Sequence, residues 1–194
     1  MILTSMKVII IGAGLSGLCT AIALRKYITD VPLDLKIYDK PDHAVDPNAT
    51  PEDQYAQRRR KLGAGLGLQS NGLHVLEDLD PKLREKAYAS GFPCTHFKWM
   101  TDGNVLLGRE YVDILPISRP LLIDDCLAQW LPEGSIQYKS VSKVIVQQGL
   151  KPTIQFEDGS TPETADLVVG ADGVGSILRK ALFGDEKKFR AQYL

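Results

Sequence analysis

The stretch KVIIIGAGLSGLCTAIALRK, residues 7–26, decides the fold class of this chain. Residues 7–11 are apolar and mostly β-branched after the first lysine, which is typical of a strand buried on both faces. Apolar residues at helical spacing over 15–27 predict a helix, and the alternating stretch 33–38 predicts a second strand. Together they predict a strand–helix–strand unit of about 30 residues, the size of a βαβ crossover.

The loop between the first strand and the helix is rich in glycine. It supplies six candidate cofactor-binding residues: Gly12, Ala13, Gly14, Leu15, Ser16 and Gly17. In such a loop the first glycine permits a tight turn, the second admits a pyrophosphate, and the third lets helix and sheet approach closely. The helix start adds free N–H groups and a positive partial charge. The pattern predicts a dinucleotide site but does not separate NAD from FAD.

An acidic residue stands where the second strand is predicted to end. Asp39 lies 22 residues after Gly17 and is followed by Lys40. A carboxylate at this place accepts hydrogen bonds from the hydroxyls of an adenosine ribose, and it would repel a 2′-phosphate. We therefore include Asp39 and Lys40 among the candidate cofactor contacts. The alternative is an ordinary loop acid beside a lysine.

The rest of the chain mixes helices with antiparallel hairpins. Further strands are predicted at 63–69, 94–101, 104–112, 135–138, 142–148, 153–157 and 166–170. Further helices are predicted at 72–79 with Asn71 as cap, at 82–89, from Pro120 to Leu131, and from Ser176 to Phe183. The apolar stripe of the helix after Pro120 consists of Ile123, Leu127, Trp130 and Leu131. Asp102-Gly103 is a hairpin turn signal, and Asp158-Gly159 is expected to close a meander of the strands from 135 to 157.

A second motif follows the last predicted strand. Residues 166–179 read DLVVGADGVGSILR, so that Asp172 and Gly173 come directly after a buried strand. Ligands of parallel sheets bind at the carboxyl ends of the strands. We therefore expect Asp172 at the same edge as the first glycine loop. An Asp-Gly turn that merely caps a helix is the alternative.

These motifs together resemble a known family. GAGLSG (12–17), DLVVGADGVGSILR, GAGLGLQSNG (63–72) and ISRPLLIDDCL (117–127) are similar to segments of the FAD-dependent aromatic hydroxylases, the group A flavoprotein monooxygenases. The resemblance implies an α/β fold: a Rossmann-like FAD-binding domain with a parallel sheet and a β-meander, plus part of an antiparallel substrate-domain sheet. It implies four segments: 1–90 and 118–187 for FAD binding, 91–117 for the substrate-domain sheet, and 188–194 for the start of a further substrate-domain part.

The resemblance also implies roles for individual residues. The glycines of 12–17 would hold the FAD pyrophosphate, and Asp39 would hold the ribose. Arg119 and Arg60 would reach the phosphate or ribityl region, and Val144 would contact adenine through its backbone. Asp172 and Gly173 would support the cofactor edge and the use of NAD(P)H as co-substrate. The flavin carries the chemistry in this family, so no catalytic side chain is assigned.

The composition of the chain limits the classes of partner that we expect. The formal net charge of -1 gives no reason to expect nucleic acid or an anionic membrane. Cys19, Cys94 and Cys126 form no CxxC pair, which favours a reducing, cytoplasmic setting. The three histidines lack metal-ligand spacing, and no apolar run reaches the roughly 18 residues of a membrane span. The expected partner is a small-molecule substrate.

Family members continue further than this chain and carry a third fingerprint around the flavin ring that is not found in these 194 residues. We therefore expect the isolated chain to be incomplete as an enzyme. One alternative is a non-catalytic nucleotide-binding protein that self-associates or depends on a partner chain. Another is an NAD-dependent dehydrogenase, against which the second motif argues.

Overall fold

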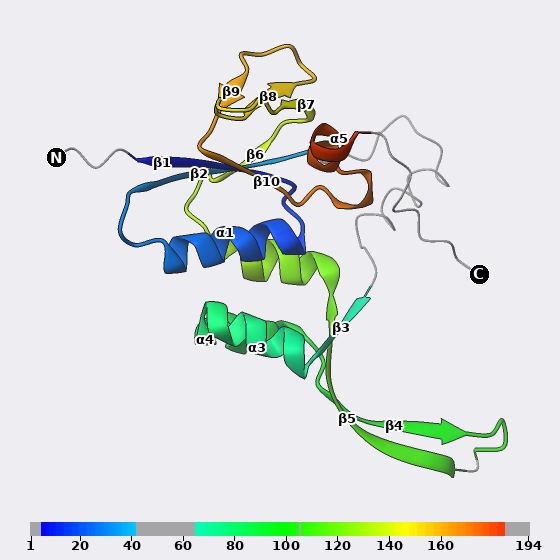
Figure 1. Ribbon diagram of the computed structural model, residues 1–194. Coiled ribbons are helices and arrows are strands. Elements are labelled where there is room, and N and C mark those ends of the chain that lie inside the picture. The colour runs from blue at the N-terminus through cyan, green and yellow to red at the C-terminus, as the bar shows by residue number, and fades with distance from the viewer. Residues whose placement is uncertain (1–4, 42–64, 105, 185–194) are drawn as a thin grey trace, which may run out of the picture. The chain divides into compact units, whose positions relative to one another are not determined.

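The computed structural model describes residues 5–41, 65–104 and 106–184. The chain divides into two compact units (Figure 1). The first unit combines residues 1–42 with 131–194, and the second comprises residues 43–130. Each unit has its own sheet structure, and the two are described separately below.

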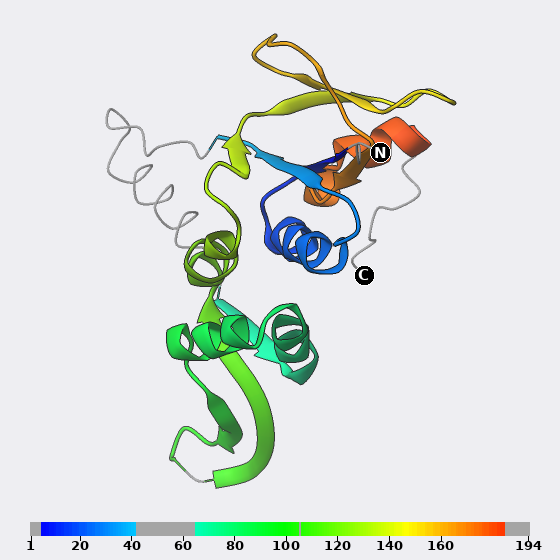
Figure 2. The ribbon, with the colours of Figure 1, turned by 90° about the vertical axis from the view of Figure 1, so that its left-hand side faces the viewer.

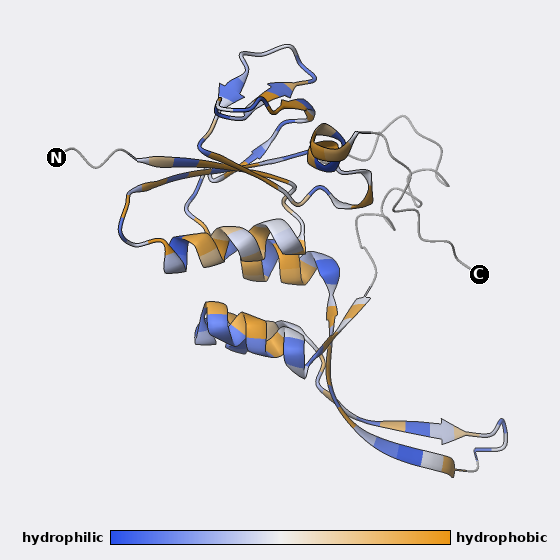
Figure 3. Cartoon of the chain, in the orientation of Figure 1, coloured by the Kyte–Doolittle hydropathy of each residue, from blue (hydrophilic) through white to orange (hydrophobic). Residues whose placement is uncertain are grey.

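The first unit is built on a four-stranded parallel sheet in the order β10-β1-β2-β6. Its strands are β1 (Met6–Ile11), β2 (Leu33–Asp39), β6 (Ile136–Tyr138) and β10 (Leu167–Gly170). Ile10 of β1 pairs with Ile37 on one side and with Val169 on the other, so β1 is central. The continuous apolar run predicted this double burial, and Figure 3 shows hydrophobic residues predominating in the middle of the sheet.

The parallel sheet of the first unit is covered on both faces (Figures 1 and 2). Helix α1 (Leu15–Tyr27) lies against one face and buries Leu18, Ala21 and Ile22. The other face carries a three-stranded meander and helix α5 (Ile177–Phe183). The cluster between sheet and meander consists of Ile9, Ile11, Tyr38, Val141, Val144, Ile154, Phe156 and Ala165. A mixed α/β fold is therefore confirmed.

The meander differs in one strand from the prediction. It runs β7 (Val141–Ile145), β8 (Thr153–Phe156) and β9 (Glu163–Thr164), in that order. The stretch predicted at 135–138 instead becomes β6 and pairs in parallel with β2. A run of three strand residues does not encode its partner, because sheet pairing depends on contacts distant in the sequence. The turn at Gly159, where φ is +71°, separates β8 from β9.

Helix α5 begins as predicted. The Ser176 hydroxyl oxygen accepts a hydrogen bond from the Arg179 N–H at 3.1 Å, which makes Ser176 the N-cap. A short 3₁₀ turn, η3 (Gly173–Gly175), precedes it. The cap fixes the chain direction immediately after the second motif.

The second unit contains an antiparallel sheet in the order β3-β5-β4. Its strands are β3 (Gly65–Gln69), β4 (Cys94–Met100) and β5 (Leu106–Ser118). The turn at 102–103 joins β4 to β5, as predicted. Strand β5 is longer than the prediction because its second half pairs with β3, from Ile114 opposite Gln69 to Ser118 opposite Gly65.

Two helices of the second unit follow β3: α3 (Ser70–Leu79) and α4 (Pro81–Ser90). The prediction of Asn71 as an N-cap is wrong, because the helix already starts at Ser70 with Gln69 as its cap residue. The Asn71 side chain instead accepts from the adjacent Gly72 N–H at 2.9 Å. Asp80 caps α4 by accepting from the Lys82 N–H at 2.8 Å.

The helix after Pro120 is present but is wound differently from the prediction. It forms a π-helix, η1 (Leu121–Leu127), and then a 3₁₀ turn, η2 (Ala128–Trp130). The Ala128 N–H donates to the Ile123 carbonyl oxygen, five residues earlier. This wider turn changes the inward stripe, so the buried residues are Leu122, Cys126 and Leu127. Ile123 and Trp130, which α-helical spacing places inward, are only half-buried.

A single carboxylate ties the meander of the first unit to its parallel sheet. Glu163 in β9 accepts from Lys7 Nζ at 2.7 Å, from Lys36 Nζ at 3.0 Å and from the Tyr38 hydroxyl at 2.5 Å. Burial opposes ionisation of Glu163, but the hydrogen bonds from Lys7, Tyr38 and Lys36 outweigh it and lower its pKa to about 2. Burial, and then the hydrogen bond to the same carboxylate, raise the pKa of Tyr38.

The lowered pKa of Glu163 predicts an acid-labile contribution to stability. Because the folded-state pKa of about 2 lies below the ordinary value of 4.5, this contribution is complete above pH 4.5. It is lost as the pH falls toward 2. We expect Glu163→Gln to lower the unfolding free energy at neutral pH and to flatten its slope in this acid range. Urea unfolding at a series of pH values tests this, and a slope equal to that of the wild type would contradict it.

The core of the meander predicts a large truncation cost. Ile154 is fully buried, whereas Val146, just beyond β7, is 47% exposed. We expect Ile154→Ala to lower the unfolding free energy by about 2–5 kcal/mol, because it removes buried methyl groups and leaves a cavity. The matched surface change Val146→Ala should stay within about 0.5 kcal/mol of the wild type. Urea denaturation measures both, and equal effects would contradict the assigned core.

Candidate functional site

The site begins where β1 ends, at Gly12. This residue has φ +106°, a conformation that favours glycine. Its N–H donates to the Tyr38 carbonyl oxygen at 2.7 Å. A Cβ atom at residue 12 would lie only 2.4 Å from the Ala171 carbonyl oxygen. Residue 12 is therefore enclosed by two neighbouring strand ends, and no other residue type fits there without a shift of the backbone.

The remaining two glycines of the loop have opposite environments. A Cβ atom at residue 17 would lie 1.9 Å from the Gly12 carbonyl oxygen, so Gly17 is required for the close approach of α1 to the loop. At Gly14, in contrast, a Cβ atom would meet no atom of the described residues within 4 Å. The loop is thus closed toward the protein at Gly12 and Gly17 and open at Gly14. The close packing at Gly12 and Gly17 is what a tight turn and a close helix require, and a pyrophosphate beside Gly14 stays a prediction.

The first turn of α1 offers backbone donors to this open side. The N-cap residue is Gly14, which has no side chain to accept a hydrogen bond from the first turn. The first turn of α1 also holds no acidic residue. The Leu18 N–H donates to the Gly14 carbonyl oxygen at 3.0 Å. The N–H groups that precede Leu18 at a helix start have no partner within the helix, so they are suited to bind an anion.

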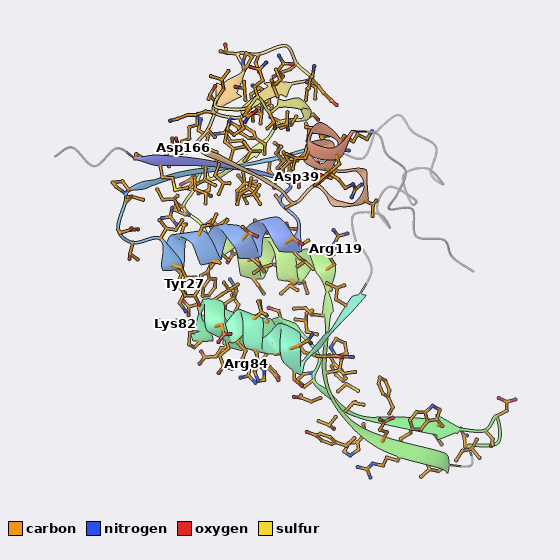
Figure 4. All side chains as sticks on the ribbon, viewed as in Figure 1. Tyr27, Asp39, Lys82, Arg84, Arg119 and Asp166 are labelled. Atoms are coloured by element: carbon orange, nitrogen blue, oxygen red, sulfur yellow. The ribbon has the colours of Figure 1, made fainter. Side chains whose placement is uncertain are left out.

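Asp39 lies against the glycine loop. It is the last residue of β2, and Figure 4 labels it near the end of the sheet opposite to Asp166. Its Oδ2 accepts from the Ala13 N–H at 2.9 Å, and its Oδ1 accepts from the Lys40 N–H at 2.7 Å. The carboxylate that the sequence assigns to a ribose therefore also orders the loop, a role that sequence reasoning missed.

The second motif meets the first at the same sheet edge, as the parallel topology predicts. The Ala171 N–H donates to the Ile11 carbonyl oxygen at 2.7 Å, directly before Gly12. Asp172 Oδ2 accepts from the Ile177 N–H at 2.6 Å. Asp172 Oδ1 is buried and has no hydrogen-bond partner in the part of the chain that the structure describes. A buried, unpartnered carboxylate oxygen marks a place where a ligand donor or an ordered water is needed.

Four other predicted contacts lie in different parts of the chain. Val144 lies in β7, an edge strand of the meander, and its side chain is buried. Arg119 belongs to the second unit, where it is exposed in the first helical turn after β5 (Figure 4). Arg60 lies outside the described residues. Gly173 follows Asp172 with φ +76°, a conformation that glycine adopts readily.

Sequence reasoning missed two residues of this site. Tyr38 and Ala171 take part through backbone groups. The Tyr38 carbonyl oxygen accepts the Gly12 N–H, and the Ala171 carbonyl oxygen leaves no room for a Cβ atom at residue 12. Their side chains give no signal of such roles, because any residue carries a carbonyl oxygen. The described ranges hold no group of three residues that could bind a metal ion. They also hold no helix long and apolar enough to cross a membrane.

No protein-family model matches the chain. Individual relatives do. The chain is 25% identical over 202 residues to 3-amino-4-hydroxybenzoate 2-monooxygenase of Streptomyces cremeus, covering 94% of this chain and 43% of that protein. It is 28% identical over 195 residues to the chloroplastic zeaxanthin epoxidase of Spinacia oleracea, covering 92% of this chain and 26% of that protein.

The chain is homologous to FAD-dependent monooxygenases. A Photorhabdus luminescens protein assigned as an FAD-containing monooxygenase matches at 28% identity and a TM-score of 0.64, over 90% of this chain and 41% of that one. Klebsiella pneumoniae HpxO, solved with FAD and uric acid, shares the fold at 23% identity and a TM-score of 0.67, over 90% of this chain and 41% of HpxO. The monooxygenase homology agrees with the resemblance carried by the two motifs.

The two glycine environments predict losses of stability of different size when a methyl group is added. Gly17→Ala should lower the unfolding free energy by about 1–3 kcal/mol or more, because its Cβ would overlap the Gly12 carbonyl oxygen. Gly14→Ala should cost less than about 1 kcal/mol, because the space beside it is open. Urea unfolding of both variants provides the comparison. Equal losses would show that the loop is not packed as described.

Proposed function

We propose that this chain is the FAD-binding portion of an NAD(P)H-dependent flavoprotein monooxygenase that hydroxylates an aromatic or related small molecule. The observation that supports it best is the meeting of the two motifs at one sheet edge, with Gly14 open and Asp172 Oδ1 unpartnered. The chain spans 43% of the length of its Streptomyces relative and 26% of the spinach epoxidase, so the activity of a whole enzyme is part of the proposal.

The residues at this edge fit a dinucleotide. The open side of Gly14 leaves room for a pyrophosphate beside the backbone. The first-turn N–H groups of α1 would donate to its oxygens, and the helix dipole would favour its negative charge. Asp39 would accept from ribose hydroxyls with lone pairs that its bonds to Ala13 and Lys40 leave over. These residues bind and orient the cofactor without moving protons.

The second motif would hold the other part of the cofactor. Asp172 Oδ1 would accept one donor, either a cofactor hydroxyl or a water that bridges to it. Gly173 would keep the backbone next to it free of a side chain, and the backbone of Val144 would contact adenine from β7. The bound flavin would supply the redox chemistry by accepting a hydride from NAD(P)H and activating O₂.

A role for the second unit belongs to the same proposal. Residues 1–90 and 118–187 would contribute to FAD binding, with Arg119 and Arg60 directed to the phosphate or ribityl region. Residues 91–117 and 188–194 would belong to the substrate domain. We further propose a cytoplasmic setting, which Cys19, Cys94 and Cys126, all free thiols, support.

A partner-dependent protein is the second candidate function, and one observation favours it. Trp99, Leu107 and Tyr111 on β4 and β5 are 51%, 69% and 69% exposed. Trp99 pairs with Gly108, so it lies on the opposite face of the β4–β5 pair from Leu107 and Tyr111. Large apolar side chains exposed on these strands are suited to contact another chain or a further part of the same protein. An NAD-dependent dehydrogenase is disfavoured, since the second motif and the relatives point to FAD.

The absorption spectrum of the chain purified with added FAD tests the proposal directly. Flavin bands that stay with the protein through gel filtration are expected. A colourless protein that binds NAD would favour a dehydrogenase, and one that binds neither would overturn the proposal. Size-exclusion chromatography with light scattering on the same sample tests self-association.

The ribose contact predicts a specific loss of affinity. Asp39→Ala should weaken FAD binding by about 1–3 kcal/mol, the usual loss for hydrogen bonds to a charged group. The matched control is Asp34→Ala, because Asp34 is an exposed acid on the same strand. Fluorescence titration with FAD measures both variants. An Asp39→Ala protein with wild-type affinity would remove Asp39 from the site.

A further inference from the structure

The Glu163 cluster joins elements that carry the dinucleotide loop. Lys7 lies on β1, while Lys36 and Tyr38 lie on β2. β1 runs directly into Gly12, and β2 ends at Asp39. One carboxylate from the meander therefore holds the two strands whose carboxyl ends form the candidate site.

The path from Glu163 to the loop passes through Tyr38. The ring of Tyr38 is buried and packs edge-on against Phe156, with ring centroids 4.9 Å apart. Its hydroxyl donates to Glu163 Oε1 at 2.5 Å. Its carbonyl oxygen accepts the Gly12 N–H at 2.7 Å, and the next residue, Asp39, accepts the Ala13 N–H at 2.9 Å. Two consecutive N–H groups of the loop are thus held by residues 38 and 39.

The cluster is poorly suited to a purely stabilising role. Taking two ammonium groups, a carboxylate and a phenol partly out of water carries a desolvation cost, and apolar residues of similar volume often stabilise as well. The adjacent core of Ile9, Ile154 and Phe156 already supplies apolar contact between sheet and meander. The cluster adds specific geometry, because each hydrogen bond fixes the position of one side chain on β1 or β2 relative to Glu163.

We propose that Glu163 is a positioning residue of the dinucleotide site, which fixes Tyr38 and through it the Gly12 and Ala13 N–H groups; this inference rests on the proposed FAD-binding function. Glu163 contacts no cofactor. It sets the geometry of the loop before the cofactor arrives, and so reduces the ordering that binding would otherwise require.

Three variants separate this role from general stability. Glu163→Gln removes the charge and turns an N–H₂ group toward donors. Tyr38→Phe removes only the hydroxyl and keeps the ring against Phe156. The double variant tests whether the two act in one path. Glu157→Gln is the matched control, since it makes the same chemical change at an exposed position of the same meander.

The first measurement is amide hydrogen exchange of the protein without FAD, at a pH where circular dichroism shows every variant folded. We expect exchange in the segment 12–17 to be about tenfold faster in Glu163→Gln and faster in Tyr38→Phe. Glu157→Gln should match the wild type. A merely structural role would raise exchange evenly across β1, β2 and β8, without a local maximum at the loop.

The second measurement is the FAD dissociation constant of the same proteins. Glu163→Gln should raise it about tenfold, and the double variant should be no weaker than Glu163→Gln alone, because both changes interrupt one path. Wild-type protein that binds no FAD would overturn the proposed function, while the exchange experiment would still decide the present inference. Unchanged loop exchange in folded Glu163→Gln would overturn it. If that variant fails to fold, unchanged loop exchange in Tyr38→Phe would do so.

Discussion

The site depends on the close backbone contact at Gly12. The chain leaves β1, turns with a positive φ, and passes between the Tyr38 carbonyl oxygen and the peptide of Ala171. There is no room for a Cβ atom on this path. A Cβ atom at residue 17 would lie 1.9 Å from the Gly12 carbonyl oxygen, so the start of α1 packs directly against the loop. One steric constraint therefore brings the start of α1, the last residue of β2 and the second motif to one edge of the sheet.

Electrostatics supports this arrangement at both ends of the parallel sheet. At the carboxyl end, Asp39 accepts the Ala13 N–H and so brings a negative charge close to the loop. At the other end, Asp166 accepts the Lys7 N–H at 2.7 Å and pairs with Lys151 at 2.5 Å. Glu163 of the meander also forms ion pairs with Lys7 and Lys36 of the parallel sheet. The meander is thus fixed by charged groups along its border and by apolar packing at its centre.

The homology and the geometry carry different parts of the functional argument. By name, the relatives include a 3-amino-4-hydroxybenzoate monooxygenase and a zeaxanthin epoxidase, and one solved neighbour is named as an FAD-containing monooxygenase. That breadth is why the substrate is proposed only as an aromatic or related small molecule. The geometry bears on the proposed cofactor site more directly, because among the described residues Gly14 has open space beside it and Asp172 Oδ1 is an acceptor without a hydrogen-bond partner.

The sequence by itself determined the local elements of this protein. The glycine loop, the buried strands, the hairpin turn at 102–103 and the Ser176 cap were all predictable, because each depends on residues adjacent in the chain. The tertiary structure alone decided the partner of β6, the π-helical winding of η1, and the backbone roles of Tyr38 and Ala171. Strand partners and carbonyl acceptors come from contacts between distant segments, and no local pattern of side chains encodes them. The π-helical winding of η1 is likewise not marked by the apolar spacing of residues 120–131.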